Sequence, residues 1–334
     1  MDLQTIWFIL IGVLFAGYAI LDGFDLGVGI LQLFCRRETE RSALLQSIAP
    51  FWDGNEVWLL TGGGALFAAF PHAYATVFSG FYLAIMLLLV GLIFRAVSIE
   101  YRNQVASAGW RAFWDKAFSL SSALVALLLG VALGNVIVGI PLDSGMNYTG
   151  SFFTLLRPVP LLTGIAGLFA ITLQGAVYLQ LKTSGELRKK ANKWAKSSLE
   201  LFAAAIFLLA LGIALLHRER FFLFLDREWS YVAIVITLAI ILALHSSLRN
   251  NAHSAAFVLS SCNLLSLFLI TALFLFPNIV NGSDPAASLT IYNASSSPLT
   301  LRTMLIIACI GMPVVLGYTI YVYRLFRTNR AGGM

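Results

Sequence analysis

The chain has 334 residues, of which 59% are hydrophobic and only 11% are charged. About a quarter of the residues in a soluble globular domain are charged, so this composition excludes a soluble enzyme and predicts an integral membrane protein. The net charge of +6 does not indicate a nucleic-acid partner, because in a membrane protein the placement of Lys and Arg matters more than their sum. The three cysteines, Cys35, Cys262 and Cys309, have the spacing of neither a disulfide framework nor a zinc site.

The hydropathy of the chain predicts nine membrane-spanning helices. A helix needs about twenty apolar residues to cross the hydrocarbon layer. Nine stretches meet this need: 5–34, 54–70, 75–97, 117–140, 158–181, 199–216, 231–245, 255–276 and 304–326. The first lacks the basic start and cleavage site of a signal peptide, so we expect it to be an uncleaved span. None shows the two-residue alternation of a transmembrane barrel. We therefore expect an all-α integral membrane protein with one transmembrane domain over 1–334.

The distribution of basic residues predicts the orientation of the chain. With nine spans the two termini lie on opposite sides of the membrane, and 17 of the 22 Lys and Arg residues fall on one face. The positive-inside rule assigns this face to the cytoplasm. We therefore expect the N-terminus outside and the C-terminus in the cytoplasm, with membrane lipid around the bundle.

The first span contains two aspartates, Asp22 and Asp25, in the segment AILDGFDLGVGIL. An ionised carboxylate at the centre of a membrane helix costs at least about 2.5–3.5 kcal/mol, so these side chains are expected to face protein or water. They are three residues apart and share one helix face, in the cytoplasmic third of the span. Gly23, Gly27 and Gly29 predict that a second helix packs closely against this segment.

Two further acids, Asp53 and Glu56, open the second span from the same side, in IAPFWDGNEVWLL. Four carboxyls are thus expected to converge near the cytoplasmic mouth of the first two helices. Carboxyls that are partly desolvated and close together can exchange protons near neutral pH. We interpret the four acids as a candidate proton path from the cytoplasm.

A structural interpretation of the same acids stays open. Asp53 would cap the second span, because a helix N-terminus favours an anion. The two aspartates of the first span would form ion pairs with Arg36, Arg37 or Arg41. A cap accounts for Asp53, but it does not account for two acids inside the first span.

Charged and aromatic residues near the cytoplasmic face have two interpretations each. Arg95, Glu100 and Arg102 end the third span and are typical of interfacial charges that reach to the membrane surface. The alternative is that they are charge partners of the acids. Trp52 and Trp58 are typical interfacial aromatics.

The sequence lacks the residues that would bind a cofactor. Haem in a membrane bundle needs His or Met ligands from within the spans, whereas the histidines lie at helix ends or connections: His72, His217, His245 and His253. No phosphate-binding loop, dinucleotide fingerprint or Cys/His metal cluster is present in the sequence. We expect this chain alone to bind no haem and no metal.

Five segments together resemble one known family. They are DGFDLGVG in the first span, SIAPFWDGNEVWLLTGGGALFAAFP at the second, FSGFY and FRAVSIEYR in the third, and YNASSSPLTL before the last. The chain resembles subunit II of the cytochrome bd quinol oxidases along its whole length. The resemblance does not distinguish the branches of that family, of which the cyanide-insensitive type is one.

The resemblance implies a subunit of a bacterial respiratory-chain enzyme in the cytoplasmic (inner) membrane. The complex would oxidise quinol and reduce dioxygen to water, with protons taken from the cytoplasm. Its haems, two b-type and one d-type or b in its place, would lie with the quinol site in subunit I, the heterodimer partner. Subunit II would fold as two four-helix bundles plus one peripheral helix. Small single-span subunits and a structural quinone or lipid occur in some members of the family.

The resemblance also assigns roles to individual residues. The family's proton-path aspartate matches Asp53, and the pair in the first span matches Asp22 and Asp25. Trp58 matches a tryptophan near a proposed oxygen route at the subunit boundary, with Trp52 beside it. The alternatives are a purely structural membrane subunit and a proton-coupled secondary transporter. A transporter predicts inverted repeats and interrupted helices around a midplane site, and the sequence shows neither.

Overall fold

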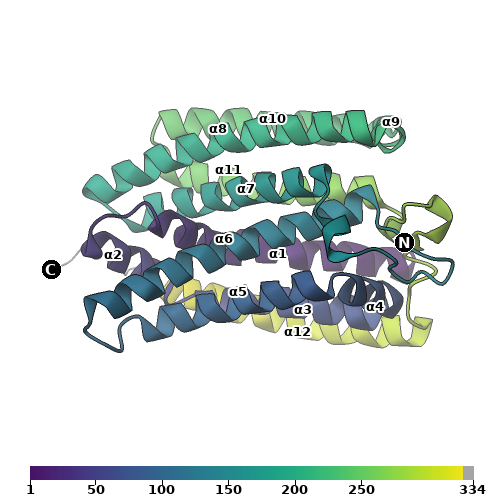
Figure 1. Cartoon of the computed structure of the whole chain (residues 1–334), viewed down its shortest axis with the longest axis horizontal. Helices are drawn as coiled ribbons and strands as arrows, with labels where there is room; N and C mark the ends of the chain where they lie inside the picture. The colour runs from purple at the N-terminus through teal and green to yellow at the C-terminus, as the bar shows by residue number, and fades with distance from the viewer. Residues whose placement is uncertain (326–334) are drawn as a thin grey trace.

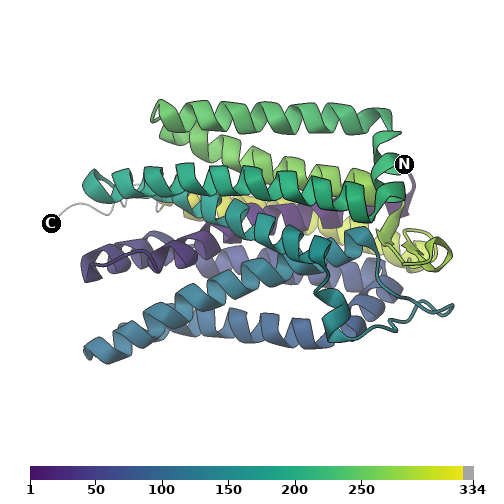
Figure 2. The same cartoon turned by 45° about the horizontal axis from the view of Figure 1, so that its top comes forward.

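The computed structural model describes residues 1–325. Its long helices run side by side along one axis (Figures 1 and 2). The helices are α1 (Leu3–Gln32), α2 (Glu38–Ile48), α3 (Trp52–Ala69), α4 (Pro71–Gly80), α5 (Tyr82–Tyr101), α6 (Ala108–Val138), η1 (Phe152–Leu155), α7 (Pro158–Lys182), α8 (Gly185–Leu216), α9 (Arg218–Leu225), α10 (Glu228–Arg249), α11 (His253–Leu275), η2 (Pro285–Ala287) and α12 (Pro298–Leu325). Two short strands, β1 (Asn278–Val280) and β2 (Leu289–Thr290), pair antiparallel.

Within residues 1–325, eight helices are long and apolar enough to cross a membrane: α1, α5, α6, α7, α8, α10, α11 and α12. The chain is therefore a multi-pass membrane protein. Helices α1 and α7 lie at the centre of the bundle and pack against each other. Helices α8 and α10 lie along one edge in Figure 1, and α3, α5 and α12 lie along the opposite edge.

The second and third predicted spans take a different form in the structure. Helix α3 corresponds to the second span but is not among these eight helices, because its 18 residues include Asp53, Asn55 and Glu56 in the first turns. It ends at Ala69, and Pro71 begins α4. Proline suits the first turn of a helix and disfavours helical geometry in the residue before it, which explains this break. The third predicted span, 75–97, is divided between α4 and α5, with a second break at Phe81.

Helix α8 is longer than the sixth predicted span, 199–216. It begins at Gly185 and therefore includes the basic segment that precedes the predicted span. No proline or glycine occurs between Glu186 and Gly212, and the segment is rich in good helix formers, so nothing ends the helix there. The last position of the ninth predicted span, 326, lies outside the described residues.

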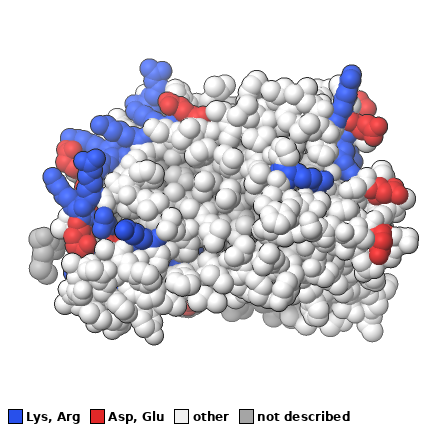
Figure 3. Space-filling view, viewed as in Figure 1, with Lys and Arg blue, Asp and Glu red and all other residues white. Residues whose placement is uncertain are grey.

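The two ends of the bundle differ in charge. Lys and Arg gather at one end, on the left in Figure 3, and we call it the basic end. Helix α2 lies there (Figure 1). The opposite end carries the N-terminus and the small sheet (Figures 1 and 2).

The predicted close packing at the glycines of the first span is confirmed. A Cβ added at Gly27 would lie 2.2 Å from the carbonyl oxygen of Ile171, and one at Gly175 would lie 2.4 Å from the carbonyl carbon of Gly27. The backbones of α1 and α7 therefore touch at this point. In α3, Gly62 packs against Phe15, whereas neighbouring glycines have open space beside them. The three cysteines are unpaired.

Candidate functional site

The aspartates of α1 are buried among helices, away from the lipid. Asp22 is 0% exposed and Asp25 is 1% exposed. Helices α3, α6, α7 and α11 all pack against α1. This environment explains how two carboxyls can exist inside an apolar helix, because neighbouring side chains can replace the water that they lose.

Asp22 belongs to a group of three charged side chains that we call the Arg95 cluster: Asp22, Glu56 and Arg95. The Arg95 Nη1 atom lies 2.5 Å from Asp22 Oδ2, and its Nη2 atom lies 3.3 Å from Glu56 Oε2. Arg95 is fully buried, whereas the Glu56 side chain is 20% exposed. The cluster joins α1, α3 and α5.

These contacts decide between the sequence-based interpretations of the basic residues. Asp22 pairs with Arg95, so the expectation that it pairs with Arg36, Arg37 or Arg41 is wrong. The interfacial interpretation of Arg95 is also wrong, because its guanidinium is buried. The distant position of Arg95 in the sequence explains the difference, since only packing of α5 against the bundle brings it to α1.

Asp25 belongs to a second group that we call the Asp25 triad: Asp25, Asn55 and Tyr323. The Asn55 Nδ2 atom donates to Asp25 Oδ2 at 2.8 Å and also lies 3.3 Å from the carbonyl oxygen of Leu21. The Tyr323 hydroxyl donates to Asn55 Oδ1 at 2.8 Å. The ring of Tyr323 stacks on Phe51, with centroids 4.5 Å apart. The triad therefore joins α1, α3 and α12.

Several polar atoms of these two groups have no hydrogen-bond partner in the described part of the chain. They are Asp22 Oδ1, Asp25 Oδ1, the Arg95 Nε and the nearby Tyr18 hydroxyl. A buried polar atom without a partner is costly, and such atoms are commonly satisfied by internal water. The site therefore has the chemistry to hold water and protons.

Asp53 stands apart from the buried acids. It is exposed, in the first turn of α3. Phe51 is the N-cap residue of this helix, and no side chain makes a capping hydrogen bond there. Asp53 lies in the first turn, where the helix N-terminus favours an anion, as the structural interpretation predicted.

The two tryptophans lie beside the site. Trp52 and Trp58 are both partly exposed. The Trp58 ring packs against α1, since a Cβ added at Gly17 would lie 2.4 Å from its Cε3 atom. This contact holds α3 against α1.

A second buried network lies at the basic end, around Arg102. Its Nε atom lies 2.6 Å from Asp115 Oδ1, and its Nη2 atom lies 2.7 Å from Glu38 Oε1. Gln32 and Arg41 also contact Asp115, at 2.5 and 3.4 Å. Arg102 is 1% exposed, so its interfacial interpretation is wrong.

The other charges at the basic end are more exposed. Glu100 is exposed, in agreement with an interfacial position. Glu40 on α2 accepts a hydrogen bond from Lys190 on α8. This bond holds the pKa of the Glu40 carboxyl below its ordinary value.

Three residues of these groups were missed by sequence reasoning: Asn55, Asp115 and Tyr323. Asn55 sits between Asp53 and Glu56 in the quoted motif, and its place next to the acids was the available signal. Nothing in the local sequence links Asp115 to Arg102, or Tyr323 to Asn55, since the latter pair is 268 positions apart.

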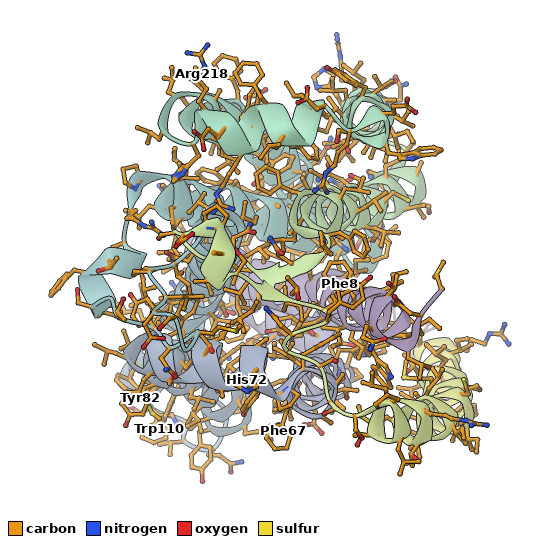
Figure 4. The ribbon with its side chains drawn as sticks, turned by 90° about the vertical axis from the view of Figure 1, so that its right-hand side faces the viewer. Phe8, Phe67, His72, Tyr82, Trp110 and Arg218 are labelled. Carbon is orange, nitrogen blue, oxygen red and sulfur yellow. The ribbon has the colours of Figure 1, made fainter. Side chains whose placement is uncertain are left out.

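The histidines do not gather at the site. Figure 4 shows His72 on α4 and Arg218, which begins α9 and follows His217, on opposite sides of the bundle. His253 lies at the start of α11, with its Nδ1 atom 2.7 Å from Gln180 Oε1. Within residues 1–325, no three His, Cys, Asp or Glu side chains are grouped as metal ligands.

Comparisons with known proteins identify the family. The model of the family "cytochrome bd terminal oxidase subunit II" matches residues 3–326. Cytochrome bd-I ubiquinol oxidase subunit 2 of Escherichia coli (strain K12) is 38% identical, over 96% of this chain and 93% of the relative. Cytochrome bd ubiquinol oxidase subunit 2 of Bacillus subtilis (strain 168) is 33% identical, over 98% of this chain and 96% of the relative.

A solved structure shares the fold. A chain in the structure of bd oxidase from Geobacillus thermodenitrificans superposes with a TM-score of 0.81 at 17% identity, covering 98% of this chain and 100% of that chain. The likeness of fold agrees with the match of the sequence along its length. The chain belongs to the cytochrome bd terminal oxidase subunit II family.

Proposed function

We propose that this chain gives a bd-type quinol oxidase its cytoplasmic proton entry and supports the haem-bearing partner subunit. The complex oxidises quinol and reduces dioxygen to water. The b-type haems, the haem d or the b in its place, and the quinol site belong to subunit I. The observation that carries the proposal is the buried pair of acids on α1, of which Asp22 contacts Arg95 together with Glu56, and Asp25 accepts a hydrogen bond from Asn55.

The exposure of the acids supports an order along the path. Asp53 is exposed at the start of α3, and Glu56, one turn further on, is 20% exposed. Asp22 and Asp25 are buried in the bundle. A proton taken up by Asp53 would thus pass by Glu56 to the buried pair. Ionisable groups at such depth commonly mark proton relays in membrane proteins.

The orientation of the chain is part of the same proposal. The basic end faces the cytoplasm, the N-terminus lies outside, and α3 is counted as a ninth span. The gathering of Lys and Arg at one end (Figure 3) supports this orientation. We propose that the nine helices are arranged as in the family, in two four-helix bundles plus one peripheral helix. Membrane lipid would surround the bundle where the partner subunit does not.

A structural role has support for one of the acids. The ion pair with Arg95 ties Asp22 to α5, so Asp22 contributes to packing whatever else it does. Asp25 has no Lys or Arg within ion-pair distance among the described residues. Ion pairing therefore does not account for Asp25, and this supports a place for Asp25 on the proposed proton path.

The test replaces single carboxyls by amides in the assembled complex. We expect Asp53→Asn and Asp25→Asn each to lower quinol-driven oxygen consumption about tenfold or more, because each removes a proton-exchanging group. Asp226→Asn is the matched control, since Asp226 is exposed and follows α9. The yield of complex is measured for each variant.

The outcomes separate the two roles. Lost turnover with normal yield supports the path. Wild-type turnover and yield in both variants would overturn the path and leave the supporting role. Lost yield in both variants, with normal turnover per assembled complex, would favour a purely structural role.

A further inference from the structure

We infer that Asn55 and Tyr323 are positioning residues that make Asp25 the proton-exchanging carboxyl of the site, while Asp22 is engaged in its ion pair with Arg95. The inference rests on the proposed proton entry and deepens it. It divides the work between the two aspartates of α1, and it brings the last helix of the described chain, α12, into the site.

The balance of charge separates the two aspartates. Of the three carboxyls Asp22, Asp25 and Glu56, two lie within ion-pair distance of the Arg95 guanidinium. Both contacts of this guanidinium go to Asp22 and Glu56, at 2.5 and 3.3 Å. A buried carboxylate without a cation is far more costly than a neutral carboxyl. Asp25 is therefore the acid that binds a proton in the resting site.

The hydrogen bonds of Asp25 indicate which oxygen exchanges the proton. Its Oδ2 atom accepts from the Asn55 amide at 2.8 Å, and its Oδ1 atom is buried without a partner in the described part of the chain. In a protonated carboxyl, the oxygen that accepts from an N–H group is the better carbonyl oxygen, which leaves the other oxygen to carry the proton. The proton therefore resides on Oδ1, where it can leave to an internal water and be replaced.

The Tyr323 hydroxyl fixes which end of the Asn55 amide faces Asp25. It donates to Asn55 Oδ1 at 2.8 Å, so the Nδ2 donor points to the carboxyl. If the amide turned round, its carbonyl oxygen would accept the proton of Asp25 in a hydrogen bond. The proton would then be held, and its transfer would slow.

The position of Tyr323 suits this role. Its ring stacks on Phe51, which precedes α3, so the ring stays in place when the hydroxyl alone is removed. The rest of α12 is largely exposed, with Leu301 its one buried residue among those described. The hydroxyl is therefore a specific polar contact at the basic end of an otherwise peripheral helix.

The experiment compares two tyrosines of the same helix in the assembled complex. Tyr323→Phe removes the hydroxyl that orients Asn55, and Tyr321→Phe is the control, since Tyr321 is 62% exposed. Oxygen consumption with excess quinol is measured across a range of pH, together with complex yield. We expect Tyr323→Phe to lower turnover about three- to tenfold, the effect of one lost hydrogen bond, and to displace the pH–rate profile. Tyr321→Phe should match the wild type.

A second variant tests the amide itself. Asn55→Leu keeps the approximate size of the side chain and removes its polar atoms. We expect it to lower turnover about tenfold or more and to change the pH–rate profile in the same sense as Tyr323→Phe. If the Asn55→Leu complex does not assemble, the comparison of Tyr323→Phe with Tyr321→Phe alone tests the inference.

Each outcome supports or overturns the inference. Slower turnover with a displaced pH–rate profile in Tyr323→Phe, at normal yield, supports it. A Tyr323→Phe complex that behaves like Tyr321→Phe overturns it, and so does slower turnover with an unchanged profile, which a merely structural role would give. If Asp25→Asn is defective but Tyr323→Phe is normal, the positioning inference fails alone. If Asp25→Asn keeps full turnover, the inference fails, and if Asp53→Asn also keeps full turnover, the proposed proton entry fails with it.

Discussion

Replacement of Arg95 by glutamine removes the guanidinium that Asp22 and Glu56 both contact. Arg95 and Asp22 are each 0% exposed, so Arg95→Gln leaves a buried carboxylate at Asp22 without its cation. Glu56 is less affected, because its side chain is 20% exposed and can turn to water. We therefore expect the loss of stability to arise mainly at Asp22.

The magnitude follows from burial. Removal of one partner from a buried ion pair costs about 3–5 kcal/mol, whereas replacement of both partners by neutral groups is often tolerated. The double variant Arg95→Gln/Asp22→Asn holds no unpaired charge at Asp22. We expect the second substitution to recover about 2–3 kcal/mol of the stability lost in the first, a coupling typical of residues in direct contact.

The assay is thermal unfolding of the purified complex, with wild type, both single variants and the double variant side by side. At about 2 °C per kcal/mol, the recovery corresponds to an unfolding midpoint about 5 °C higher in the double variant than in Arg95→Gln alone. Arg249→Gln, at an exposed position that ends α10, is the control. A double variant whose losses equal the sum of the single losses would refute the reasoning.

Two further predictions concern the packing of α1 and the contacts of α2. A Cβ at Gly27 would lie 2.2 Å from the carbonyl oxygen of Ile171, so Gly27→Ala should destabilise the complex by about 1–3 kcal/mol and lower its yield. Gly12→Ala has open space and should change neither, and a normal yield of Gly27→Ala would contradict the predicted contact. Lys190 lowers the pKa of Glu40 from 4.5, so their pair stabilises the fold above that pH, and this contribution is lost as the pH falls through the lower folded value. Lys190→Gln should therefore lower the free energy of unfolding by less than about 1 kcal/mol at about pH 7, with a slightly lower unfolding midpoint. The difference in midpoint between variant and wild type should disappear in acid. An equal difference in midpoint at neutral and acid pH would count against this assignment.

The general architecture could be predicted from the sequence because long apolar runs have few alternatives in a membrane. The end of α3 was predicted to within one residue, but the break at Phe81 was not, since α4 and α5 follow one another within a continuously apolar stretch. Apart from Pro71, no residue in the sequence of these spans indicated where one helix ends and the next begins. The basic start of α8 was also missed, because charge indicates the membrane boundary but does not end a helix.

The candidate site could be predicted in part. The acids of α1 stand out because hydrocarbon tolerates few charges, and the glycines beside them correctly indicated a close neighbour. Their partners could not be assigned, since Arg95 and Tyr323 come from α5 and α12. Nearby arginines in the sequence were the natural guess for Asp22, but a bundle of helices brings together residues by packing rather than by sequence distance.

The separation of Asp22 from Arg95 has a consequence for how the protein is made. The two residues are 73 positions apart, so α1 leaves the ribosome well before the helix that carries its counter-ion. Tyr323, on α12, follows later still. During synthesis the aspartates of α1 therefore lack these partners until the later helices are made, and in that interval they are either neutral or shielded from lipid by the insertion machinery. The polar site is complete only when α12 packs near α1. The order of translation therefore also sets the order in which the buried charges of this membrane protein gain their partners.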